Sequence, residues 1–87
     1  MEDIFLKNLP SIDLYGYDTE SARVATNDFI DENIFLKNPK ILIIHGKGMG
    51  LVKSSVHSTL ASRKEVSKYY TDNFNDGCTI VNLVVDK

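Results

Sequence analysis

The strongest structural signal in the chain is Lys40-Ile-Leu-Ile-Ile-His-Gly-Lys-Gly-Met-Gly50, followed by Leu-Val-Lys-Ser-Ser-Val-His57. Its apolar run over residues 41–44 predicts a central strand with both faces covered, or nearly so. The glycines then break this strand, and the apolar spacing beyond them predicts a helix over about 50–62. A buried strand that passes through a glycine loop into a helix is typical of an α/β fold.

The glycine loop has the composition of an anion site. Glycines at alternate positions permit positive φ, so backbone N–H groups can point at a phosphate beside a helix N-terminus. His45 adds a titratable group, and Lys47 adds a fixed cation. The glycine spacing matches neither the Walker loop nor the Rossmann fingerprint, so the sequence excludes both of these nucleotide-binding motifs. A turn that serves only strand-to-helix packing is the alternative.

The rest of the chain predicts one more strand–glycine–helix unit and two further strands. Residues 12–16 alternate in hydrophobicity and stop at a glycine, which indicates a short strand. The next helix should be capped at Asp18 or Thr19 and end near Asn38-Pro39. Strands are expected over 66–71 and 79–85. The order βαβαββ places both helices on one face and predicts a two-layer α/β sandwich.

The two strand-to-helix junctions should form one site. Parallel strands end at the same edge of a sheet, so the end of the first strand is predicted to lie beside His45. Asp13 and Tyr15 share a face of their strand. Either Asp13 or His45 is a candidate for moving a proton in phosphodiester chemistry, while Lys47 and the loop amides would stabilise negative charge. In the alternative reading, Asp13 only caps a turn, His45 is a satisfied strand-end histidine and Tyr15 is a surface aromatic.

The same two segments carry a family resemblance. Ile12-Asp13-Leu14-Tyr15-Gly16 and His45-Gly46-Lys47-Gly48 stand some thirty residues apart, and the chain ends in Gly77-Cys-Thr-Ile-Val-Asn-Leu83. In these motifs it resembles the Smr (small MutS-related) domain from about Ile12 to about Val85. The resemblance implies a mixed four-stranded sheet, similar to the C-terminal domain of translation initiation factor three. It predicts an arm over residues 1–11 and an Smr-like domain over 12–87.

The resemblance also implies a function, because Smr domains are described as nucleases that nick or cleave DNA or RNA. It implies an endonuclease with Asp13 and His45 as catalytic residues. The residues predicted to bind nucleic acid are Tyr15, Gly46, Lys47, Gly48, Gly50 and Lys53. Many relatives have His where this chain has Tyr15, whose phenol is a poor base at neutral pH. Tyr15 is therefore a candidate for stacking on an unpaired base. The alternatives are a catalytically silent module that docks on nucleic acid or a ribosome, and a protein-interaction domain.

Composition limits the remaining possibilities. The net charge is −2, but residues 1–39 balance to −5 and residues 40–87 to +3, which predicts a local basic face around the glycine loop. The single cysteine, Cys78, excludes an intramolecular disulfide and a cysteine-rich zinc site.

With no signal peptide or long apolar run, a cytoplasmic protein without membrane partners is expected. His57 is predicted to be an exposed helical residue. Oligomeric state and metal dependence stay open, with Mg²⁺ as a candidate cofactor.

Overall fold

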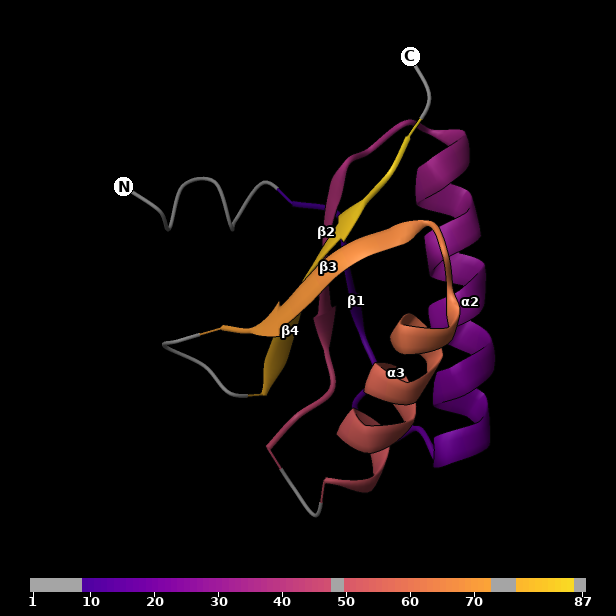
Figure 1. Cartoon of the computed structure of the whole chain (residues 1–87). Coiled ribbons are helices and arrows are strands. Elements are labelled where there is room, and N and C mark those ends of the chain that lie inside the picture. The colour runs from indigo at the N-terminus through magenta and orange to yellow at the C-terminus, as the bar shows by residue number, and fades with distance from the viewer. Residues whose placement is uncertain (1–8, 48–49, 73–76, 86–87) are drawn as a thin grey trace.

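A computed structural model describes residues 9–47, 50–72 and 77–85 of the chain (Figure 1). Its elements follow the predicted order βαβαββ. They are β1 (Ser11–Asp13), α2 (Thr19–Phe35), β2 (Lys40–Ile44), α3 (Leu51–Ser62), β3 (Val66–Thr71) and β4 (Cys78–Leu83). The β3 strand has the predicted bounds, whereas β1 begins at Ser11, inside the segment expected to be an arm.

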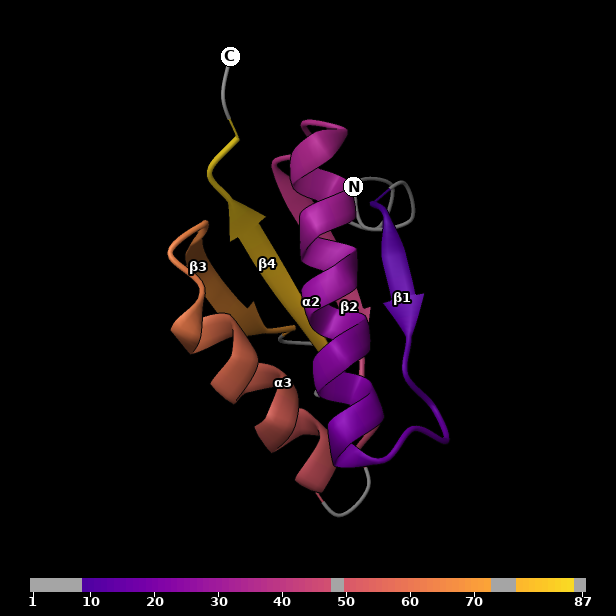
Figure 2. The same ribbon diagram turned by 90° about the vertical axis from the view of Figure 1, so that its right-hand side faces the viewer.

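The sheet is mixed, and its strand order is β1-β2-β4-β3. The β1 and β2 strands are parallel, whereas β4 runs antiparallel to both of its neighbours, β2 and β3. Consequently β3 runs parallel to β2 with β4 inserted between them, as two successive β–α–β steps require. Figure 2 shows β1 and β3 as the two edges. The β3 edge contains a register shift between Val66 and Lys68.

Both helices cover the same face of the sheet, and the core lies between the two layers (Figures 1 and 2). Ile41 and Ile43 of β2 point into this core and are fully buried together with Ile30 of α2. Leu42 and Ile44 point to the other face and are only half-buried. The prediction that β2 is covered on both faces is therefore only partly right. The strand is central in the sheet, but α2 and α3 pack on one side of it.

Local hydrogen bonds decide where β1 and α2 end. The Asp13 carboxylate accepts a hydrogen bond from the Tyr15 N–H at 2.9 Å, which turns the chain out of the sheet before the predicted end at Gly16. The α2 helix begins as predicted, because the Asp18 side chain accepts from the Ser21 N–H. It ends at Phe35 rather than near Asn38. Lys37 has a left-handed φ of 61°, a conformation that closes a helix.

A polar contact joins the two helices at the end away from the β1–α2 and β2–α3 junctions. Arg63, which directly follows α3, donates to the Asn27 side-chain oxygen at 2.9 Å and to the Asp31 carboxylate at 2.6 Å, both on α2. Its Nε also donates to Glu65 at 3.1 Å. Neither of the described helices is long and apolar enough to cross a membrane.

Candidate functional site

The two strand-to-helix junctions lie side by side, as predicted. Asp13 pairs with Ile44 across the parallel strands, and the Leu14 N–H donates to the Ile44 carbonyl at 2.8 Å. Beyond these strand ends lies a pocket of about 410 Å³ between the starts of α2 and α3. It is lined by Tyr17, Asp18, Thr19, His45, Gly46, Gly50, Leu51, Val52 and Lys53. The Ser55 hydroxyl donates to the Thr19 carbonyl at 2.9 Å and so joins the two helix starts.

The N-terminus of α3 faces this pocket without a side-chain cap. Its N-cap is Gly50, with a φ of 86°, and helical bonding begins where Ser54 N–H donates to the Gly50 carbonyl at 2.9 Å. The first-turn amides of a helix have no acceptor within the helix, and its dipole attracts anions to this end. Lys53 belongs to the same first turn. This helix end therefore combines backbone donors with a cation.

The N-terminus of α2 differs, because it already has an anion. The Asp18 carboxylate accepts from the Ser21 N–H at 2.7 Å, and this backbone hydrogen bond is the main reason why the pKa of Asp18 lies below its usual value. Asp18 thus presents a carboxylate on the α2 side of the pocket. The two walls differ in charge: the α3 side has Lys53 and the first-turn backbone donors of α3, and the α2 side has the Asp18 carboxylate.

The glycines of the loop do not all contribute in the predicted way. Gly46 and Gly50 have the predicted positive φ, at 85° and 86°. A Cβ at either position would meet no atom within 4 Å, so glycine is needed there for its backbone angle and not for space. The Gly46 N–H donates to the Gly77 carbonyl at 2.9 Å and is not directed at a phosphate. Gly48 lies outside the described residues.

His45 is buried, with 7% of its surface exposed, and both ring nitrogens have partners within the protein. Its Nδ1 lies 3.0 Å from the Gly46 carbonyl, and a carbonyl only accepts, so Nδ1 carries a proton. Its Nε2 lies 2.7 Å from the Thr79 hydroxyl, which donates to Nε2 when the ring is neutral. The geometry of His45 thus matches a histidine whose hydrogen bonds are made within the protein more closely than a base that faces the pocket.

His57 extends this chain of hydrogen bonds, contrary to the prediction that it is merely exposed. Its Nε2 lies 2.8 Å from the Thr79 hydroxyl oxygen, to which it donates if Thr79 donates to His45. Burial, followed by the charges of His45 and Lys53, lowers the pKa of His57. No local pattern in the sequence predicts this contact, because the pairing of β4 with β2 brings Thr79 to a residue on α3.

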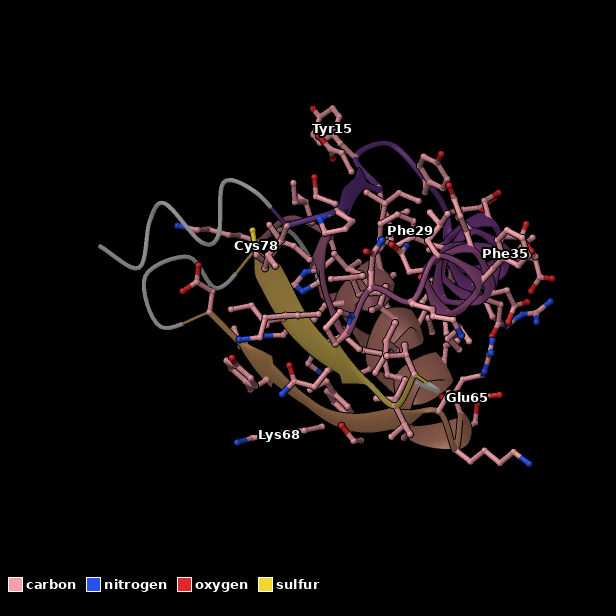
Figure 3. All side chains as sticks on the ribbon, turned by 90° about the horizontal axis from the view of Figure 1, so that it is seen from above. Tyr15, Phe29, Phe35, Glu65, Lys68 and Cys78 are labelled. Atoms are coloured by element: carbon pink, nitrogen blue, oxygen red, sulfur yellow. The ribbon has the colours of Figure 1, made fainter. Side chains whose placement is uncertain are left out.

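Asp13 and Tyr15 do not line the pocket. Asp13 pairs with Ile44, whose side chain lies on the face opposite Ile43 and the helices, so the Asp13 carboxylate and the His45 ring lie on opposite faces of the sheet. Tyr15 is 87% exposed and projects beyond the β1 edge (Figure 3). The strand ends are adjacent, but the two predicted catalytic side chains are not brought together.

The basic residues separate into two groups along α3. Lys47 follows the strand that ends beside the pocket, and Lys53 lines the pocket itself. Arg63 is at the other end of α3, where it is paired with Asp31 and Glu65. Lys68 lies on β3 (Figure 3). Its Nζ is 5.5 Å from the Tyr70 ring centroid. The predicted basic face therefore reduces to Lys47 and Lys53 near the loop.

The described residues contain no group of three or more His, Cys, Asp or Glu side chains placed to hold a metal ion. Cys78 is buried, and this burial, together with the charges of Asp72 and Asp13, raises the pKa of its thiol.

Comparison with known proteins bears on both fold and family. The family model described as "Smr domain" matches residues 12–84. The chain is 35% identical over 74 residues to "Endonuclease MutS2" of Clostridium acetobutylicum, covering 85% of this chain but 9% of that protein. It is 28% identical over 78 residues to the protein of the same name from Clostridium perfringens, covering 90% and 10%. The chain thus spans about a tenth of the length of these relatives.

Two solved structures share the fold. The Smr domain of Thermus thermophilus MutS2 superposes with a TM-score of 0.83 at 23% identity, over 86% of this chain and 98% of that one. YdaL, a stand-alone small MutS-related protein from Escherichia coli, gives a TM-score of 0.80 at 28% identity, over 84% and 63%.

Proposed function

The chain belongs to the Smr domain family, and from that premise we propose that it is a nucleic-acid-binding domain whose pocket between α2 and α3 holds a backbone phosphate. The observation that carries this proposal is the uncapped N-terminus of α3, which opens into the pocket beside Lys53. The phosphate would accept from the first-turn amides of α3, with Lys53 and Lys47 as its counter-charges.

Salt and a matched pair of substitutions test this proposal. Lys53→Ala should weaken binding of a short labelled oligonucleotide and reduce its salt dependence by about one phosphate contact. Lys64→Ala removes the same charge from an exposed position beyond the other end of α3 and should leave affinity unchanged. Equal losses from the two variants would contradict a localised site. Binding of a protein partner, with no affinity for polynucleotide at low salt, would favour the protein-interaction alternative.

Endonuclease activity is the second candidate function, and the observation that favours it is the 35% identity to a protein named as an endonuclease. The geometry supports binding more directly than cleavage, because neither Asp13 nor His45 directs an unpartnered group into the pocket. The substrate would be RNA or DNA, free or on a ribosome. A cytoplasmic location also remains a prediction.

Asp13→Asn provides a clean test of cleavage. Asparagine keeps the oxygen that accepts from the Tyr15 N–H but removes the charge. If the wild type cleaves RNA or DNA, with or without Mg²⁺, and Asp13 acts in catalysis, this variant should lose about 10² to 10⁴-fold in rate while it melts normally. An unchanged rate would restrict Asp13 to the turn. A wild type that binds but never cleaves would support the silent module.

A further inference from the structure

The pocket offers more than a phosphate needs. A site for phosphate alone requires donors and cations, which the α3 side supplies through Lys53 and the helix start. The pocket also has apolar walls formed by Tyr17, Leu51 and Val52. Leu51 is 63% exposed, so this apolar surface is accessible to a ligand. A ligand with both a charged and an aromatic part would use both kinds of wall.

Tyr17 is positioned to receive the aromatic part. Tyr17 lines the pocket and is 40% exposed, and its backbone N–H donates to the Leu14 carbonyl at 3.0 Å, which holds the turn in place. An exposed aromatic on a fixed backbone is the type of surface on which proteins that bind single strands stack bases.

Charge gives the ligand a direction. A phosphate is attracted to the α3 side, and the Asp18 carboxylate repels it from the α2 side, where Tyr17 lies. The uncharged base therefore belongs next to Tyr17. The volume of about 410 Å³ is in the range of pockets that enclose one small molecule.

We propose that the pocket takes one unpaired nucleotide, with its phosphate at the N-terminus of α3 and its base against Tyr17. This inference rests on the proposed function and specifies its substrate class. Bases inside a duplex are already stacked and have no free face for Tyr17. The domain therefore prefers single strands, or nucleotides turned out of a helix, to an intact duplex of the same length.

Fluorescence tests the contact directly, because the chain has no tryptophan. Tyr17→Trp places a single indole in the pocket wall. Tyr70→Trp is the matched control, because Tyr70 is 38% exposed but pairs with Ile80 on the face away from the helices. Each variant is titrated with a single-stranded oligonucleotide of DNA or RNA, its duplex, and a single strand of the same length without bases.

The base-bearing single strand should quench Tyr17→Trp and leave Tyr70→Trp unchanged, while the strand without bases binds without quenching. Tyr17→Ala should lower single-strand affinity by about 5- to 150-fold. Binding that depends on Lys53 but leaves Tyr17→Trp unquenched, or equal affinity for duplex and single strand, would overturn the nucleotide pocket and leave the phosphate site standing. A wild type that binds none of these nucleic acids would overturn both proposals.

Discussion

Thr79 is the residue on which the interior of the site depends. Its hydroxyl is fully buried between His45 and His57, and by donating to His45 Nε2 it acts together with the Gly46 carbonyl to favour the tautomer with a proton on Nδ1. Thr79→Val should lower the free energy of unfolding by about 1–3 kcal/mol, because both imidazoles lose a buried partner. Urea unfolding measures the loss, and ¹⁵N NMR of the imidazole rings reports the tautomer of His45.

Thr79→Ser keeps the hydroxyl and is the control for this prediction. Its His45 spectrum should match that of the wild type, although the lost methyl group will cost some stability. If Thr79→Val leaves the His45 spectrum unchanged, the Gly46 carbonyl alone sets the tautomer, and the Thr79 hydroxyl does not contribute to it.

The strand ends at this site were predictable from the sequence, but the directions of their side chains were not. Which face Asp13 occupies relative to His45 depends on the register between β1 and β2, and a shift of one residue would reverse it. That register is set by packing across the sheet and by the backbone contact from Leu14 to Ile44. The hydrogen bonds from His45 through Thr79 to His57 join residues from three separate segments of the sequence. No single segment therefore predicts them.

At the scale of elements, Arg63 holds the far end of α3 against α2. Its side chain is 17% exposed and bonds to Asn27, Asp31 and Glu65. Arg63→Ala should lower the free energy of unfolding by about 1 kcal/mol, because it removes the packing of a largely buried side chain and its bonds to one amide and two solvent-accessible carboxylates. Lys64→Ala, a neighbouring exposed position, should change stability by less than about 0.5 kcal/mol. Chemical denaturation compares the two variants.

Oligonucleotide binding gives the contrasting measurement. Arg63 is separated from the pocket by the length of α3, so folded Arg63→Ala protein should bind as the wild type does. A loss of affinity in the folded variant would mean that the spacing of α2 and α3 at one end controls the pocket at the other.

The elements themselves were largely predictable, because their signals are local. The alternation in β3 and the turn residues after it predicted Val66–Thr71 without error. The ends of α2 and β1 were not predictable in this way. The left-handed conformation of Lys37 and the turn at Asp13 end these elements a few residues before the local helix and strand signals do. The burial of the face of β2 that carries Leu42 and Ile44 was overestimated. An unbroken apolar run does not indicate how many layers cover a strand.

For the whole molecule, the lowered pKa of His57 predicts how the stability of the fold depends on pH. Its folded pKa lies below the ordinary value of 6.5, mainly because of burial, so the unfolded chain takes up the proton first as pH falls. This contribution is complete above about pH 6.5 and is lost as the pH falls through the folded pKa. The melting temperature should therefore decrease between pH 7 and pH 5.

His57→Gln isolates this effect, because the glutamine amide can replace Nε2–H as a donor but does not titrate. Its melting temperature should vary less over the same range. The carboxylates whose pKa is also lowered affect stability only at more acidic pH, below their ordinary pKa values of 3.8 to 4.5. They are Asp18, Glu20 and Glu65. Equal slopes for the two proteins would assign the pH dependence to another group.

The two edges of the sheet have a consequence for how molecules of this domain behave when crowded. The β1 edge is only three residues long, and the β3 edge is interrupted by the shift between Val66 and Lys68, next to an exposed lysine. Short, irregular and charged edges are poor templates for a strand from another chain. The domain therefore resists the sheet-to-sheet growth that leads to fibres, even when many copies are crowded together.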